Sequence, residues 1–126
     1  MNDKRSVLFV EDDAFLARIY AKTFEDGGFE VRLASNGEDG LKLAARDRQD
    51  LIILDILLPG IDGFEVLEKL KADPATKDVP VIVLSNLGQR EDVERATGLG
   101  AAGYMIKAHA LPQEVVRKAK EILKIG

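Results

Sequence analysis

The sequence predicts an α/β fold in which a parallel β-sheet is covered by helices on both faces. Short apolar runs alternate with longer stretches whose apolar residues recur at helical spacing, and small turn residues separate the two kinds of segment. Most of the apolar runs are nearly continuous, as in strands that are buried on both faces. Because strand and helix alternate five times within 126 residues, parallel crossover units in one domain are favoured.

Five segments are predicted to be strands. In the second, Phe29, Val31 and Leu33 alternate with Glu30 and Arg32, which indicates a strand with one more exposed face. We therefore expect residues 29–33 at an edge of the sheet. The near-continuous apolar runs cover residues 6–10, 50–54, 79–84 and 104–106.

The first two helices are predicted from caps and apolar stripes. The first stretch stops at Gly27 and Gly28, and its stripe consists of Leu16, Ile19, Tyr20, Thr23 and Phe24. Asn36 or Ser35 can cap the second helix, whose first turn holds Glu38 and Asp39, where negative charge is favourable. The apolar residues of this second helix are Leu41, Ala44 and Ala45.

The other three helices differ in the strength of their apolar stripes. The third follows Asp62 and Gly63, ends at Asp73 and Pro74, and carries Phe64, Leu67 and Leu70. The fourth, about residues 89–97, has only Val93 and Ala96 as inward residues and precedes a glycine-rich segment over 98–103. Pro112 suits the first position of the fifth helix. The inward residues of the fifth helix are Val115, Val116, Ala119, Ile122 and Leu123.

The composition excludes several classes of protein. A content of 46% hydrophobic and 32% charged residues is not that of a disordered chain, and no apolar run approaches the roughly 20 residues of a membrane span. A net charge of −4 without a basic stretch disfavours a nucleic-acid surface, and the absence of cysteine removes thiolate chemistry. The polar start, residues 1–5, lacks a signal-peptide pattern. We expect a soluble, cytoplasmic protein that contacts neither nucleic acid nor membrane directly.

Polar side chains gather where the predicted strands end. The carboxyl ends of neighbouring parallel strands meet at one edge of a sheet, and in a doubly wound sheet ligands bind at that edge. Right-handed crossovers permit either a singly or a doubly wound sheet here. The residues at the strand ends are Glu11, Asp12 and Asp13 after the first strand, Asp55 after the third, Ser85 and Asn86 after the fourth, and Lys107 after the fifth.

These carboxylates indicate a cation site. Two carboxylates about 4 Å apart repel by roughly 4 kcal/mol at an effective dielectric constant near 20, so three require a cation or raised pKa values. Oxygen ligands without histidine or cysteine favour a hard ion, and Mg²⁺, which keeps several waters, suits a site near the surface. Asp13 is expected to cap the first helix, and capping is the alternative for Glu11 and Asp12. Asp55 has no such local role.

The strand-end residues and their neighbours, taken in their order along the chain, resemble the motifs of the receiver domain of bacterial response regulators. The resemblance covers essentially the whole chain and is that of a single-domain, chemotaxis-regulator-like receiver. It rests on Val10–Asp13, Leu54–Gly63, Leu84–Ser85 and Gly100–Lys107. It implies a flavodoxin-like, doubly wound sheet of five parallel strands in the order 2-1-3-4-5 with five helices, and one receiver domain over residues 1–126.

The resemblance implies the chemistry of the site. Asp55 would accept a phosphoryl group from a phosphohistidine on a sensor histidine kinase or a histidine phosphotransfer protein. Asp12 and Asp55 would bind Mg²⁺ directly and Glu11 through a water, and the Leu57 carbonyl would complete the protein ligands. Such a domain is not an enzyme in the ordinary sense, because it catalyses only its own phosphorylation and dephosphorylation.

The resemblance also implies how the signal leaves the site. Lys107 would pair with the phosphoryl group, the Ser85 hydroxyl would move to bond it, and Tyr104 would be the switch aromatic. The face formed by the fourth helix, fifth strand and fifth helix would then bind a downstream protein in trans. Leu57 and Leu87 stand where the resemblance places side chains that guide or block the hydrolytic water. Since neither can form a hydrogen bond, we expect slow self-dephosphorylation.

Two positions depart from the family pattern. Ala108 stands where the family usually has a proline, often after a cis bond, and a cis bond before alanine would cost about 2.5 to 4 kcal/mol. Asn86 stands where the family usually has a smaller residue and can crowd or hydrogen-bond the phosphoryl pocket. His109, next to these residues, is expected to be a surface loop residue.

Other functions remain open on the same fold. An unphosphorylated pseudo-receiver would be a binding module only, which the intact Asp55 and Lys107 disfavour. An FMN-binding, flavodoxin-like electron carrier is disfavoured because no hydroxyl-rich phosphate loop follows the first strand and tryptophan is absent. A phosphatase of the haloacid dehalogenase type would need a second acid two residues after Asp55, where this chain has Leu57.

Overall fold

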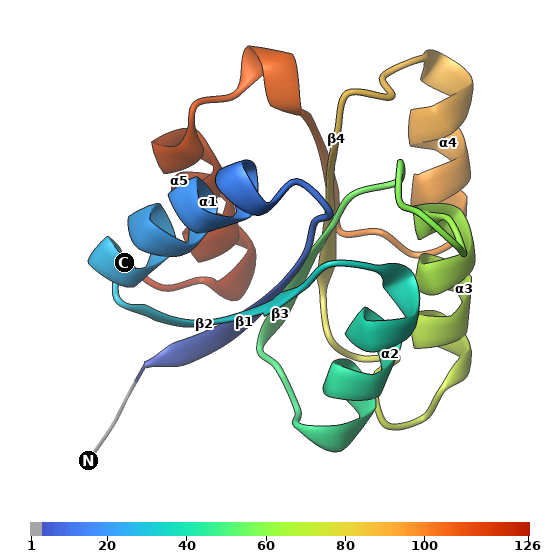
Figure 1. The fold of residues 1–126 in the computed structure, drawn as a ribbon, viewed down its shortest axis with the longest axis horizontal. Helices are drawn as coiled ribbons and strands as arrows, with labels where there is room; N and C mark the ends of the chain where they lie inside the picture. The colour runs from blue at the N-terminus through green and yellow to red at the C-terminus, as the bar shows by residue number, and fades with distance from the viewer. Residues whose placement is uncertain (1–3) are drawn as a thin grey trace.

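The computed structural model describes residues 4–126, which form a five-stranded parallel sheet between two layers of helices (Figure 1). Of the polar N-terminal segment, residues 1–3 lie outside the described range. The strand order β2-β1-β3-β4-β5 confirms the predicted order and places the alternating strand at an edge. The strands are β1 (Arg5–Val10), β2 (Phe29–Ala34), β3 (Leu51–Leu54), β4 (Val81–Ser85) and β5 (Gly103–Ile106).

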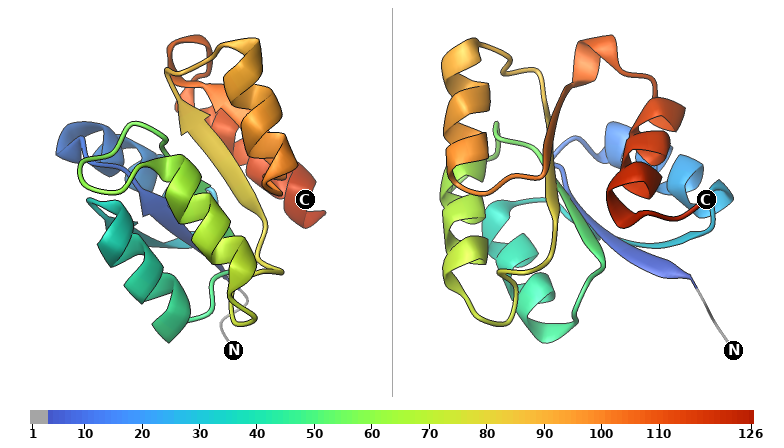
Figure 2. Two further views of the ribbon diagram at one scale, coloured as in Figure 1. Left: turned by 90° about the vertical axis from the view of Figure 1, so that its right-hand side faces the viewer. Right: turned by 180° about the vertical axis from the view of Figure 1, so that it is seen from behind.

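The helices divide between the two faces of the sheet. The helices α1 and α5 lie together on one face, and α2, α3 and α4 lie on the other, which is also clear from behind (Figure 2). Among the described residues, no helix is long and apolar enough to cross a membrane. The helices are α1 (Ala14–Asp26), α2 (Gly37–Arg46), α3 (Gly63–Ala72), α4 (Arg90–Gly98) and α5 (Pro112–Leu123), and a short 3₁₀ turn, η1 (Lys107–His109), follows β5.

The central strands are buried on both faces, which explains their near-continuous apolar runs. In β1, Val7 and Phe9 pack toward α1 and α5, whereas Leu8 and Val10 pack toward α2, α3 and α4. The strand β4 begins at Val81, two residues later than predicted. Val79 is nevertheless buried in the core, so the apolar run was longer than the strand.

The apolar residues predicted for α2 do not all lie on its buried face. Of Leu41, Ala44 and Ala45, only Ala44 is buried, and Ala45 is exposed. The buried face of α2 runs through Gly37, Gly40 and Ala44. At Gly40 an added Cβ would lie 2.8 Å from the Val10 side chain, so a glycine lets the helix approach β1 closely. Apolar periodicity cannot reveal a face built on glycine.

The amino ends of the strands are closed by polar contacts to the backbone. Asp50, just before β3, accepts a hydrogen bond from the Ser6 N–H at 2.8 Å. The buried Thr76 hydroxyl donates to the Leu70 carbonyl at 2.7 Å, near the end of α3. The Lys71 ammonium donates to the carbonyls of Lys77 and Val79 at 3.1 and 2.9 Å.

Candidate active site at the carboxyl edge of the sheet

The strand order brings the predicted site residues to one edge. Glu11 follows β1 and Asp55 follows β3, one position beyond the paired residues Val10 and Leu54. Ser85 is the last residue of β4, and Lys107 follows β5. Because β1, β3, β4 and β5 are consecutive in the sheet, these four residues lie on neighbouring strands.

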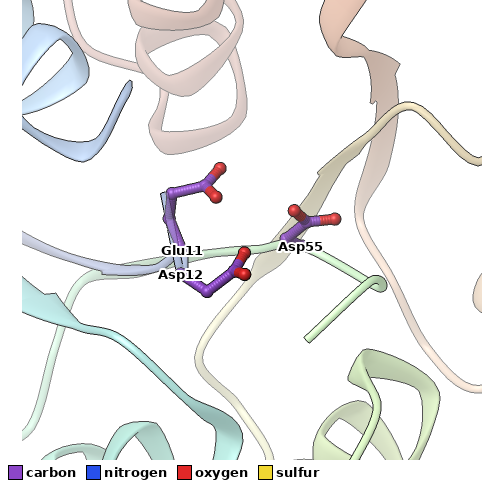
Figure 3. A group of neighbouring side chains, drawn as sticks. All are labelled: Glu11, Asp12 and Asp55. Atoms are coloured by element: carbon purple, nitrogen blue, oxygen red, sulfur yellow. The ribbon is translucent and has the colours of Figure 1, made fainter. Parts of the chain in front are cut away.

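Three carboxylates form an acidic cluster at this edge. Glu11 and Asp12 project from the end of β1 and Asp55 from the end of β3 (Figure 3), and one oxygen of each lies within 4.8 Å of the others. Glu11 and Asp55 are each only 5% exposed, whereas Asp12 is exposed. Ligand oxygens on one octahedral Mg²⁺ lie about 3 Å apart when adjacent, given bonds of about 2.1 Å. This all-oxygen set, open to solvent at Asp12, therefore fits a hard divalent cation after small side-chain movements.

A single ammonium group joins two of the carboxylates. Lys107, 11% exposed in its side chain, donates a hydrogen bond of 2.7 Å to Asp55 Oδ2 and forms an ion pair with Glu11 Oε1. Burial alone lowers the pKa of Lys107, but the hydrogen bonds to Asp55 and Glu11 outweigh it and leave the pKa above its ordinary value. Burial raises the pKa of Glu11, and the bond from Lys107 offsets this only in part. Lys107 therefore stays protonated, and its ammonium group is shared between the two buried carboxylates.

Backbone groups of the loop after β3 fix the position of Asp55. The Leu57 N–H donates to Asp55 Oδ1 at 3.0 Å, and the Gly63 N–H donates to the Ile56 carbonyl at 2.9 Å. A Cβ on Gly63 would lie 2.3 Å from the Asp55 carbonyl oxygen and 2.5 Å from Ile56 Cα, so only glycine fits at the start of α3. The sequence interpretation used Gly63 as a helix start and as part of the family motif, and it missed this role. The Leu57 carbonyl as a metal ligand stays a prediction.

Ser85 and Tyr104 meet at one residue of the β4–α4 loop. The fully buried Ser85 Oγ accepts a hydrogen bond from the Leu87 N–H at 3.3 Å, and the Tyr104 hydroxyl donates to the Leu87 carbonyl. Burial raises the pKa of Tyr104. Leu87 also packs against the core on the α2, α3 and α4 side, whereas Leu57 is 55% exposed. The two predicted switch residues are thus linked through Leu87.

The two departures from the family pattern form one contact. Asn86 Oδ1 accepts a hydrogen bond of 3.0 Å from the Ala108 N–H, so its side chain reaches the chain beyond Lys107. No peptide bond within residues 4–126 is cis, and the Lys107–Ala108 bond is therefore trans. His109 is exposed, as expected for a loop residue. Asp13 caps α1 by accepting from the N–H groups of Phe15 and Leu16, which confirms its predicted role.

Comparison with known proteins assigns the family. The sequence model of the family "response regulator receiver domain" matches residues 7–119. The chain belongs to this family. Receiver domains act in two-component signalling and are not conventional enzymes, and neither the flavin carrier nor the unphosphorylated module gains support from this match.

The relatives show how this receiver domain compares with longer proteins. It is 33% identical over 118 residues to the DNA-binding dual master transcriptional regulator RpaA of Synechocystis, covering 94% of this chain and 48% of that protein. It is 39% identical over 104 residues to the transcriptional regulatory protein AfsQ1 of Streptomyces coelicolor, covering 81% and 44%. The chain thus spans about half the length of the curated relatives it matches. The expectation of no nucleic-acid contact concerns this chain alone, because those full-length relatives are transcriptional regulators.

Solved structures of similar length show the same fold. A putative response regulator from Chloroflexus aurantiacus superimposes with a TM-score of 0.90 at 33% identity, covering 97% of this chain and 99% of that one. The chemotaxis protein CheY4 of Vibrio cholerae superimposes with a TM-score of 0.88 at 26% identity, covering 94% and 98%. These likenesses confirm the flavodoxin-like receiver fold.

Proposed function

We propose that this receiver domain accepts a phosphoryl group on Asp55 from a phosphohistidine of a sensor histidine kinase or a histidine phosphotransfer protein. The observation that carries the proposal is the buried Asp55 carboxylate bonded to Lys107 at 2.7 Å, with oxygens of Glu11 and Asp12 within 4.8 Å. Phosphoryl transfer needs positioning and charge neutralisation more than covalent chemistry, and this cluster offers both.

The Asp55 carboxylate is a suitable nucleophile. Oδ1 accepts from the Leu57 N–H and Oδ2 from Lys107, and each carboxylate oxygen has a second lone pair. One oxygen attacks the phosphorus in line with the phosphohistidine nitrogen. The new O–P bond forms as the N–P bond breaks, and the histidine nitrogen leaves with the bonding electron pair. The product on this chain is an aspartyl phosphate.

The surrounding residues stabilise the transferred group. Lys107 can bond an oxygen of the phosphoryl group without leaving the site, because its ammonium has three donors and already faces Asp55. A Mg²⁺ ion held by Asp12 and Asp55, through water by Glu11, and by the Leu57 carbonyl would neutralise further negative charge on that group. The Ser85 hydroxyl, one strand away, would donate to another phosphoryl oxygen.

The hydrogen bonds at Leu87 link phosphorylation to the face that would bind a downstream protein. When Ser85 Oγ turns to the phosphoryl group, the Leu87 N–H loses its acceptor, while Tyr104 still donates to the Leu87 carbonyl. A change at Ser85 therefore affects both the β4–α4 loop and the Tyr104 side chain of β5. We propose that the face of α4, β5 and α5 changes in this way and binds a downstream protein in trans, and that residues 1–126 act as one receiver domain.

The test is incubation with acetyl phosphate and Mg²⁺ followed by intact-mass spectrometry and Phos-tag electrophoresis. We expect one added phosphoryl group on the unmodified protein and none on Asp55→Asn, because a neutral amide is a poor nucleophile. Omission of Mg²⁺ should abolish the addition as well. Equal labelling of Asp55→Asn would contradict Asp55 as the acceptor. The absence of labelling on the unmodified protein would favour the unphosphorylated binding module.

A further inference from the structure

The contact between Asn86 and Ala108 joins the two segments that carry Ser85 and Lys107. Ser85 and Ile106 are the last paired residues of β4 and β5, so Asn86 and Ala108 lie just beyond the end of the backbone ladder. The Asn86 side-chain carbonyl accepts the Ala108 N–H at 3.0 Å. The Asn86 side chain thus adds a link between the two chains past the point where their backbones stop pairing.

We propose that Asn86 is a positioning residue for phosphoryl transfer, which fixes the backbone at Ala108 and thereby sets the place of the Lys107 ammonium over Asp55. The inference rests on the proposed function of Asp55. It assigns to Asn86 the bond from the Ala108 N–H to its amide oxygen and no contact with the transferred group.

The turn that carries Lys107 needs such a support. Lys107 begins the single 3₁₀ turn η1, which is closed by a long hydrogen bond of 3.4 Å from the Ala110 N–H to the Lys107 carbonyl. One 3₁₀ turn has poor hydrogen-bond geometry and is weakly held by its own bonds. Lysine also has a flexible four-carbon stem, so the position of its ammonium depends on a fixed backbone. The bond to Asn86 supplies a fixed point one residue away.

Neighbouring contacts make the β4–α4 loop a firm base for this bond. The Leu87 carbonyl accepts from Tyr104 of β5, and Gly88 lies so close to Ile106 that an added Cβ would be 2.5 Å from Ile106 Cδ1. The loop is therefore seated on β5 at two further points. Asn86 is the member of the loop that reaches past β5 to the residue after Lys107.

A purely structural role predicts a different outcome. Asn86 and Ala108 are both exposed, and a hydrogen bond between exposed groups adds little to folding stability. A positioning role instead predicts a slower reaction in a protein whose melting temperature is nearly unchanged. The affinity for a small phosphodonor should not change, because the proposed role gives Asn86 no contact with the donor.

The test compares Asn86→Leu, which removes the acceptor at similar size, with Asn86→Asp, which keeps it. His109→Ala, in the same exposed turn, is the matched control. Hydrogen exchange should show the Ala108 amide protected in the unmodified protein, Asn86→Asp and His109→Ala, and unprotected in Asn86→Leu. With acetyl phosphate and Mg²⁺, the saturating phosphorylation rate of Asn86→Leu should fall roughly three- to tenfold at an unchanged half-saturating donor concentration.

A double-mutant cycle with Ala108→Pro isolates the bond. Proline has no N–H, so the donor is removed, and the cycle cancels those effects of proline on the turn that do not depend on Asn86. Asn86→Leu should then cause no further slowing in the Ala108→Pro background. Equal slowing in both backgrounds, or an Asn86→Leu rate equal to that of His109→Ala, would overturn the role of Asn86 while leaving Asp55 phosphorylation standing. Failure of the unmodified protein to be phosphorylated would overturn the proposed function and this inference together, whatever the exchange data show.

Discussion

The two ends of the sheet both bury polar side chains, but these side chains have different kinds of partner. At the amino end, the Thr76 hydroxyl donates to a carbonyl in the last turn of α3, and the Lys71 ammonium donates to two carbonyls of the segment before β4. At the carboxyl end, Lys107 bonds two buried carboxylates, Glu11 and Asp55, which come from different strands. The amino end pairs polar side chains with backbone carbonyls, whereas the carboxyl end also brings ionised side chains together.

This difference separates polar groups that stabilise the fold from those that serve chemistry. A helix end leaves carbonyls without partners, and Thr76 bonds one of them, so the contact has a clear structural purpose. At the carboxyl end, the Asp13 and Leu57 N–H groups also bond the two buried carboxylates, but they do not require both carboxylates to share one ammonium, and burying charge is costly even when it is paired. We infer that the buried charges at the carboxyl end lower the stability of the fold and are kept for the proposed phosphoryl transfer, whereas the polar groups at the amino end stabilise the fold.

The largest expected effect compares the two lysines. Lys107→Met should slow phosphorylation of Asp55 by about 10²-fold or more, because a charge-stabilising donor at the reacting group is lost. Lys71→Met, at the opposite end, should leave the rate unchanged. The measurement is the rate of labelling by acetyl phosphate with Mg²⁺, with circular dichroism to verify that both variants fold. Similar rates for the two variants would remove the functional distinction between the ends.

Mg²⁺ should stabilise the protein through the carboxyl end only. A ligand present at 100 times its dissociation constant raises the free energy of unfolding by about 2.7 kcal/mol, provided that the unfolded chain does not bind it. We expect a rise in melting temperature with Mg²⁺ that is lost in Asp12→Asn and kept in Thr76→Val. A rise of equal size in Asp12→Asn would place the cation elsewhere.

Without Mg²⁺, the two ends should respond oppositely to removal of a polar group. Thr76→Val leaves the Leu70 carbonyl without its buried partner and should lower the free energy of unfolding by about 1 to 3 kcal/mol. Glu11→Gln removes one of two buried carboxylates that share Lys107, and it should leave the free energy of unfolding unchanged or higher. Urea denaturation of both variants measures this. A larger loss for Glu11→Gln than for Thr76→Val would contradict the comparison.

The smallest effect is a pH dependence at the two lysines. Burial lowers the pKa of Lys71, only partly offset by Asp78, so between that lowered pKa and the ordinary value of 10.5 the unfolded chain binds more protons. The Lys71 contribution to stability therefore rises with pH across that window, and Lys71→Met should remove the rise. The pKa of Lys107 is raised, so its contribution is fully present below 10.5 and is lost as the pH climbs through the raised value. Difference curves between each variant and the unmodified protein separate the two signs.

Much of the site followed from where the strands end. Asp55 and Lys107 each come directly after an apolar run, and a parallel sheet brings such positions to one edge whatever the details of packing. The same reasoning could not order the strands, because right-handed crossovers permit more than one winding. The order came from the resemblance to receiver domains, and the structure confirmed it.

Other features depend on contacts between distant residues and left no local signal. The bond from Ala108 to Asn86 spans 22 residues, and neither residue alone predicts it. The close approach of Gly63 to the Asp55 carbonyl is similar, because a glycine before a helix has several ordinary explanations. The apolar pattern of α2 included Ala44 and Ala45 alike, although only Ala44 is buried. Ala44 shares the buried face with Gly37 and Gly40, which an apolar pattern does not reveal.

The most direct test of the account is to locate the phosphoryl group by chemical trapping. Borohydride reduces an acyl phosphate on aspartate to homoserine, so treatment after acetyl phosphate and Mg²⁺ marks the acceptor residue in the peptide sequence. We expect homoserine at position 55 and nowhere else, with the yield reduced in Lys107→Met and unaffected in Lys71→Met. Homoserine at Asp12, or an equal yield in both lysine variants, would contradict the claim that the carboxyl end is built around phosphorylation of Asp55.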